Sequence, residues 1–198
     1  MRAGKFVFML DKKYLQSVRE DLLGYAVKRR DVIKVAGDAQ QMAKKAIFAM
    51  QRDDKEAADQ LIKTALGLLA ELNKKYKTEK DLFTEGSYRA ALEEYTEAAL
   101  FRQYLLKQVI GKMKGLEIDS DTLVGGLCDL PGELCRYAIK SATERDFVEV
   151  KKCFATAEEI VAELVDMDLT GYNRQKFDQA KQALNKLQQI AYEVSLKS

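Results

Sequence analysis

Apolar side chains recur with a helical period along almost the whole chain, and polar side chains fill the positions between them. The first such stretch covers residues 11–51, which no proline interrupts, and it predicts one long helix. Asp53 and Asp54 follow as an acidic N-terminal cap and predict a second helix that runs to about Leu72. We expect these two helices to pack antiparallel across a tight turn.

Four more stretches share this period and complete the expected fold. They predict helices over residues 87–112, from about 119 to 141, from about 147 to 165 and, after a break at 170–173, to about 194. The composition, rich in Ala, Leu, Lys, Glu and Gln, favours long helices and leaves strands little to build on. The sequence therefore predicts an all-α protein, a single-domain bundle of long antiparallel helices over residues 1–198.

Composition supports one helical domain and narrows the function classes. The chain has 198 residues, 47% of them hydrophobic and 32% charged, with one proline and no tryptophan. Its formal net charge of +2 gives no general attraction to nucleic acid, so any such binding must depend on local basic clusters. Residues 1–10 are basic and apolar but too short for a signal peptide or a membrane span, and we expect a flexible leader.

The cysteines indicate a reducing environment. Cys128, Cys135 and Cys153 are odd in number, and the chain has no C-x-x-C motif. Cys128 and Cys135 lie seven residues apart on one predicted helix, too far for a disulfide. We therefore expect packed thiols in a cytoplasmic protein, and no apolar stretch is long enough for a membrane.

Two pairs of carboxylates carry the candidate chemistry. Glu94 and Glu97 lie three residues apart on the third predicted helix, and Asp129 and Glu133 lie four apart on the fourth. Each pair therefore occupies one helix face, and two such faces turned together would gather four carboxylates. Because the chain has no histidine, a hard divalent cation such as Mg²⁺ fits these residues, whereas a di-iron site with Glu-x-x-His motifs does not.

The pattern alone leaves a second interpretation of these acids open. Glu94 and Glu97 continue a largely apolar stripe that includes Phe101, and burial of ionised carboxylates there is costly unless a metal or an ion pair compensates it. Salt bridges at an exposed helix end explain the same pair. Asp129 and Glu133 have the pattern of an ordinary polar face.

The segments Glu94-Tyr-Thr-Glu97-Ala and Gly126-Leu-Cys-Asp129-Leu-Pro-Gly-Glu133-Leu-Cys-Arg136 resemble the corresponding helices of the translin family. They are most similar to its catalytic branch, translin-associated factor X, as found in single-chain archaeal-type members. The resemblance extends from about residue 12 to the C-terminus. It implies an Mg²⁺-dependent endoribonuclease, with Mn²⁺ as an alternative ion, that cuts single-stranded RNA inside a closed homo-oligomer, typically an octamer.

Family membership would also assign roles to individual residues. It implies that Glu94, Glu97, Asp129 and Glu133 bind the metal and are catalytic. Lys80 and Arg89 would contact the RNA, or single-stranded DNA, although the basic run at residues 73–80 also suits a solvated helix end. Arg136 would hold either a phosphate or Glu133 in a salt bridge.

Pro131 allows two local structures. A proline within a helix removes a backbone hydrogen bond and kinks the axis, whereas a new helix beginning after Asp129 would accept it in its first turn. The resemblance favours a kink within one continuous helix.

Two other functions are compatible with the sequence. One is a non-catalytic, translin-like oligomer that binds single-stranded RNA or DNA, with the acids as interhelical ion-pair partners. The other is a helical scaffold without affinity for nucleic acid. Salt dependence of RNA binding distinguishes the two, because phosphate contacts weaken steeply as salt rises.

Overall fold

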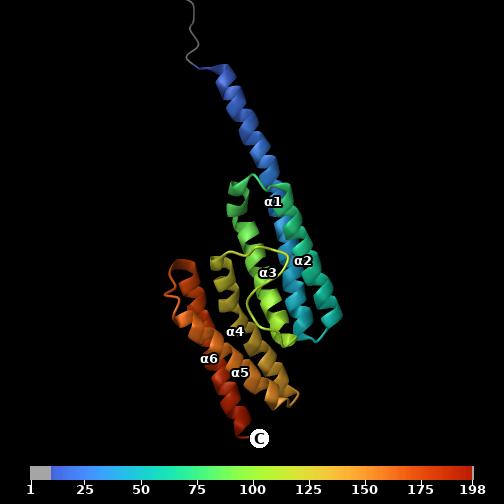
Figure 1. The fold of residues 1–198 in the computed structure, drawn as a ribbon, viewed down its shortest axis with the longest axis vertical. Coiled ribbons are helices and arrows are strands. Elements are labelled where there is room, and N and C mark those ends of the chain that lie inside the picture. Colours follow the sequence, from blue (N-terminus) through green and yellow to red (C-terminus); the bar gives the residue numbers. More distant parts are fainter. Residues whose placement is uncertain (1–9, 198) are drawn as a thin grey trace, which may run out of the picture.

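The computed structural model describes residues 10–197 of the chain (Figure 1). Within them it has six α-helices and one short 3-10 helix: α1 (Lys12–Gln51), α2 (Lys55–Lys75), η1 (Lys80–Thr84), α3 (Gly86–Leu105), α4 (Ser120–Thr143), α5 (Phe147–Val165) and α6 (Gly171–Ser195). The all-α prediction is confirmed. The expected leader, apart from Leu10, lies outside the described residues. In the described part of the chain, none of the helices has an apolar stretch long enough to cross a membrane.

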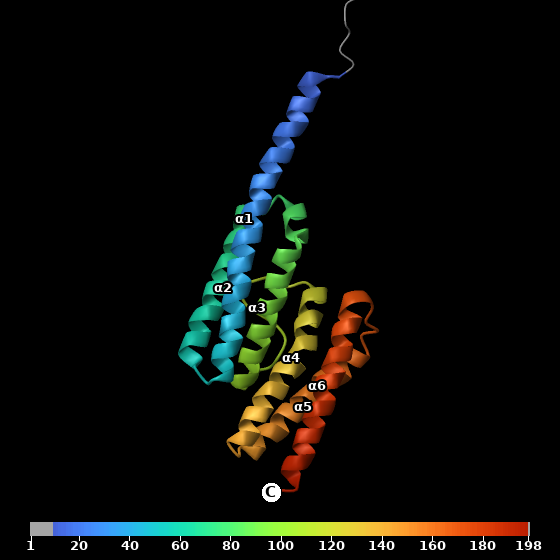
Figure 2. The ribbon, with the colours of Figure 1, turned by 180° about the vertical axis from the view of Figure 1, so that it is seen from behind.

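The helices form two groups of three that meet along α3 and α4. One group is α1 with α2 and α3, and the other is α4 with α5 and α6, as both sides of the molecule show (Figures 1 and 2). Fully buried small residues of α1 let its neighbours approach closely: Val32, Ala36, Ala39, Ala43 and Ala46. The first half of α1 projects beyond the bundle (Figure 1).

The turn between α1 and α2 follows the sequence prediction. Asp53 adopts the left-handed φ of 61°, and the N–H of Asp54 donates to the Ala49 carbonyl at 3.0 Å, which closes the end of α1. The Asp54 carboxylate then accepts from the N–H of Ala57 at 3.1 Å and caps α2. The predicted acidic cap is therefore confirmed.

The predicted end of the third helix at residue 112 is wrong. α3 ends at Leu105 because Lys107 adopts a φ of 54° and the N–H of Gln108 donates to the Gln103 carbonyl at 2.9 Å. The Gln103 side chain then bonds the N–H of Gly111 and the carbonyl of Lys112, so the chain folds back over the helix end. A lysine, which has no special preference for this conformation, ends the helix where the sequence shows no signal.

α4 runs unbroken through Pro131, so a new helix beginning after Asp129 is excluded. Its cap is Asp119, whose carboxylate accepts from the N–H of Thr122 at 2.9 Å. A Cβ added at Gly126 would lie 2.5 Å from Cγ2 of Thr96 on α3. This glycine therefore permits the close approach of α3 and α4, which brings the acid-bearing segments together.

Candidate functional site: an acidic cluster between α3, α4 and α6

Five carboxylates gather where α3 meets α4. α3 contributes Glu93, Glu94 and Glu97, and α4 contributes Asp129 and Glu133. Glu97 and Asp129 line a cavity of about 280 Å³. The predicted approach of the two acid-bearing faces therefore occurs. Contrary to the polar-face pattern of the sequence, the Asp129 and Glu133 side chains are only 26% and 10% exposed.

Glu97 differs from the other acids because it has no compensating partner. Among the described residues, no hydrogen bond or ion pair reaches its carboxyl group. Burial, followed by the charges of Asp129, Glu133 and Glu94, raises the pKa of Glu97 to about 9. A proton or an added cation is needed to neutralise this position.

Glu133 is held from two sides. The Gln51 amide of α1 donates to its Oε2 at 2.8 Å, and Arg136 Nη1 lies 3.3 Å from the same oxygen. Burial raises the pKa of Glu133, whereas the charge of Arg136 and the Gln51 bond oppose that rise. Of the two roles considered for Arg136, the structure shows the salt bridge. Its guanidinium also lies over the Phe48 ring, 5.7 Å from the centroid.

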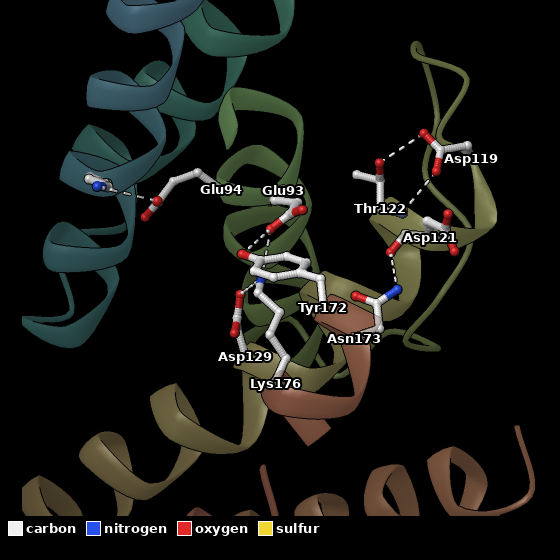
Figure 3. Close-up of polar contacts among 10 residues, drawn as sticks. Glu93, Glu94, Asp119, Asp121, Thr122, Asp129, Tyr172, Asn173 and Lys176 are labelled. Atoms are coloured by element: carbon white, nitrogen blue, oxygen red, sulfur yellow. Dashed lines mark hydrogen bonds and ion pairs between the residues drawn. The ribbon is translucent and has the colours of Figure 1, made fainter. Parts of the chain in front are cut away.

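Glu94 points toward α1 and away from Glu93 and Asp129 (Figure 3). Its Oε2 lies 3.6 Å from Lys44 Nζ. Burial raises the pKa of Glu94, and the nearby Lys44 charge opposes the rise. Glu94 would have to change rotamer to reach the cavity.

Glu93 and Lys176 complete the cluster, and neither is among the residues predicted from the sequence. Lys176, on α6, places its Nζ 2.6 Å from Asp129 Oδ2 and 2.7 Å from Glu93 Oε2 (Figure 3). The Tyr172 hydroxyl donates to the same Glu93 oxygen at 3.3 Å. Burial opposes the lysine charge, but the bonds to Asp129 and Glu93 outweigh it and raise the pKa of Lys176.

A sequence signal for Lys176 does exist. It lies four residues before Ala180 and eleven before Leu187, both on the buried face of α6. A charged residue at such a position needs partners. Glu93 has no comparable signal, because it is adjacent to Glu94 and the pattern does not show which of the two faces α4.

The donor set fits a divalent cation in charge and chemistry. The five carboxylates face three basic side chains, Lys44, Arg136 and Lys176, so two negative charges remain when all are ionised. Carboxylate oxygens suit Mg²⁺. In the described chain, no three acidic, histidine or cysteine side chains lie close enough to hold a metal together, so Glu94 and Glu133 would have to turn inward to join Glu97 and Asp129.

The predicted RNA contacts lie at the outer edge of this region. Arg89, Glu93 and Glu97 follow one another at four-residue intervals along one side of α3, which places Arg89 about 12 Å before Glu97 along the axis. Lys80 begins η1 and does not contact the acids. Both basic side chains are exposed, and the described residues offer them no ion pair.

A larger cavity of about 990 Å³ lies between the loop after α3, α4 and α5. Most of its lining is apolar, and a partly buried polar contact within it is the hydrogen bond from the Tyr104 hydroxyl to Glu149, at 2.7 Å. The smaller cavity is the stronger candidate for catalysis because it holds the unpaired Glu97 beside Asp129.

Comparison with known proteins places the fold. The sequence model of the translin family matches residues 27–198. The chain belongs to the translin family. A comparison with curated protein sequences returns no match.

The three cysteines of the chain are buried and form no disulfide, which agrees with the expectation of packed thiols.

Solved structures share this translin-family fold at low sequence identity. The crystal structure of apo-NeC3PO has a TM-score of 0.83 and 21% identity, with 95% of this chain and 100% of that chain covered. The AfC3PO–duplex RNA complex has a TM-score of 0.83 and 21% identity, covering 93% and 97%. The crystal structure of AfC3PO has a TM-score of 0.83 and 22% identity, covering 93% and 98%. At these identities the likeness establishes the fold alone.

Proposed function

We propose that this protein belongs to the catalytic branch of the translin family and is an Mg²⁺-dependent endoribonuclease that cuts single-stranded RNA in the cytoplasm. The observation that carries the proposal is Glu97, a partly buried carboxyl group without a partner among the described residues, beside Asp129 on a cavity. An unpaired acid that is shielded from solvent is costly for a structural protein and useful at a metal centre. Membership of the family supports the same conclusion.

In this proposal, four carboxylates bind the metal or accept a proton. Glu97 and Asp129 would hold the cation, Glu94 would turn inward as a further ligand, and Glu133 would serve either as another ligand or, in its present position, as a base. A bound Mg²⁺ or Mn²⁺ would offset the charge of the scissile phosphate and activate water. Glu133, oriented by Gln51 and Arg136, is placed to accept the proton of the attacking water.

The substrate is an RNA strand drawn in by local basic residues. Arg89 and Lys80 would contact its phosphates, because both are exposed and unpaired in the described chain. We propose that several copies, typically eight, enclose the cavities in a closed homo-oligomer. The structurally similar AfC3PO forms a complex with duplex RNA, so duplex RNA and single-stranded DNA are tested beside single-stranded RNA.

The deciding experiment is cleavage of end-labelled RNA by the purified oligomer with Mg²⁺, with Mn²⁺ and with EDTA. Asp129→Asn keeps the shape of the side chain but removes its charge, and should lower the rate at least about 100-fold. Asp121→Asn, on the exposed first turn of the same helix, is the matched control and should cut normally.

The alternative is a translin-like oligomer that binds single-stranded nucleic acid without cutting it. Tight binding by the intact oligomer, with no cleavage of any RNA under metal-replete conditions, would establish that alternative and remove the nuclease. Nucleoside triphosphates in the same assay test for a helical nucleotide hydrolase. Their hydrolysis in place of RNA would also contradict the proposal.

A further inference from the structure

The ammonium group of Lys176 lies between two carboxylates and bonds both of them. Its residue is 8% exposed, and its ammonium bridges one oxygen of Asp129 and one of Glu93 at 2.6 and 2.7 Å (Figure 3). These partners lie on two other helices, α4 and α3. A Cβ at Gly125 would lie 3.5 Å from the ammonium nitrogen and 3.5 Å from the Glu93 carboxyl carbon. These are ordinary van der Waals distances, so the ion pair packs directly against this position of α4.

A cation that bridges two partly buried carboxylates occupies the role of one ion in a two-metal centre. Two-metal nuclease sites hold their ions about 3.5–4 Å apart through shared carboxylates. An ammonium is a compact point charge with three donors, and it satisfies both acids without a metal. Without it, Glu93 and Asp129 would face each other as uncompensated negative charges.

We propose that Lys176 is the permanent second cation of this centre, so that each subunit binds a single divalent ion. Lys176 is then a positioning residue: it holds Asp129 through Oδ2 and leaves Oδ1 for the ion that Glu97 also binds. This inference rests on the proposed metal site. The charge balance supports it, because the two negative charges left by Lys44, Arg136 and Lys176 match one divalent ion.

The test counts bound Mn²⁺ in the full-length oligomer without RNA. Electron paramagnetic resonance measures free Mn²⁺, and titration calorimetry gives the number of ions and their affinity. The unmodified protein should bind one Mn²⁺ per subunit. Lys176→Met should bind two, because the freed carboxylates of Glu93 and Asp129 then attract a second ion.

Two further variants separate this role from a general loss of charge. Lys176→Met combined with Glu93→Gln restores the charge balance and should return the count to one. Lys181→Met removes a lysine from the same helix whose partner is the exposed Asp178, at 2.7 Å, and should leave the count and affinity unchanged. Oligomer size and melting temperature in EDTA establish that each variant is folded.

The outcomes distinguish this inference from the proposed function. Two ions per subunit in the unmodified protein would overturn the role of Lys176, even if Lys176→Met did not assemble, and would leave a nuclease possible. An unchanged count and affinity in folded Lys176→Met would overturn it equally. No Mn²⁺ binding at all would remove both proposals. One bound ion without RNA cleavage would support the role of Lys176 and remove the nuclease.

Discussion

At the scale of single residues, the cluster is organised around Glu97. Each neighbouring acid has a basic partner: Lys44 for Glu94, Arg136 for Glu133, and Lys176 for Asp129. Glu97 has none among the described residues, and burial with three nearby carboxylates raises its pKa to about 9. Its protonation should therefore affect the stability of the metal-free protein.

The first prediction concerns that stability. The folded protein binds the Glu97 proton more tightly than the unfolded chain, in which the glutamate pKa is near its ordinary value of 4.5. The stabilisation is complete below the unfolded pKa and is lost as pH rises toward about 9. In EDTA, Glu97→Gln should remove this loss and exceed the unmodified protein in free energy of unfolding by at least about 1 kcal/mol at alkaline pH.

Urea unfolding at acidic, neutral and alkaline pH measures the effect. Glu117→Gln, at an exposed position in the loop after α3, is the control and should keep the original pH dependence. A Glu97→Gln protein with the same dependence as the control would show that Glu97 ionises normally in the fold.

At the scale of helices, the site depends on how closely α3 and α4 approach. Gly126 permits that approach because its missing side chain leaves room for Thr96, and the Glu97 backbone nitrogen would lie 3.3 Å from an added Cβ. The acids on both helices are positioned by this contact more than by any bond between them.

The second prediction therefore concerns Gly126→Ala. Its Cβ would collide with Thr96 and force the helices apart, at a cost of about 1–3 kcal/mol in free energy of unfolding. Gly67→Ala is the control, because nothing lies within 4 Å of its added Cβ and alanine favours the helix. Thermal unfolding followed by circular dichroism compares the two. Equal melting temperatures would refute a steric role for Gly126.

The third prediction concerns the projecting first half of α1. Its apolar side chains stay exposed in the single chain, with Tyr14 at 67% and Leu22 at 64%. We expect this segment to contact another subunit of the proposed oligomer. Leu22→Glu should yield smaller assemblies with unchanged helix content, whereas Ser17→Glu, an exposed polar position on the same segment, should not. Light scattering after size exclusion measures both, and an intact Leu22→Glu oligomer would exclude the segment as an interface.

At the scale of the whole molecule, a net charge of +2 means that RNA affinity must come from particular positions. The fourth prediction is that Lys80→Ala combined with Arg89→Ala weakens binding of all single-stranded RNA sequences alike. The dependence of log affinity on log salt should become shallower by about 1.4, for two lost phosphate contacts. Fluorescence anisotropy at several salt concentrations measures this slope.

Two choices make that measurement specific. An Asp129→Asn background prevents cleavage during binding. Lys63→Ala combined with Lys151→Ala removes the same charge from exposed positions on α2 and α5 and should leave the slope unchanged. If both double variants lose equal affinity, general charge and not a defined RNA path would explain the binding.

Local sequence determines the helices and the four acids that resemble the family motif. Helical period accumulates over many residues, so α1, α2, α4, α5 and α6 lie close to their predicted ranges. Helical period does not predict the end of α3, because the residue that ends the helix with a left-handed conformation is Lys107 and not a glycine. Whether Pro131 divides its helix is open from the residues alone; in the structure α4 is continuous through it, and the neighbouring Leu130 and Leu134 are fully buried.

The partners of the acids come from the packing of distant helices. Lys176 lies 47 residues from Asp129 and 83 from Glu93, and Gln51 lies 82 from Glu133. Helical period shows which face of a helix is buried, but not which helix covers it or which charge it brings. The chain's own pattern therefore determines the helices and their acidic residues, whereas the docking of α6 and α1 against α3 and α4 leaves Glu97 as the unpaired acid.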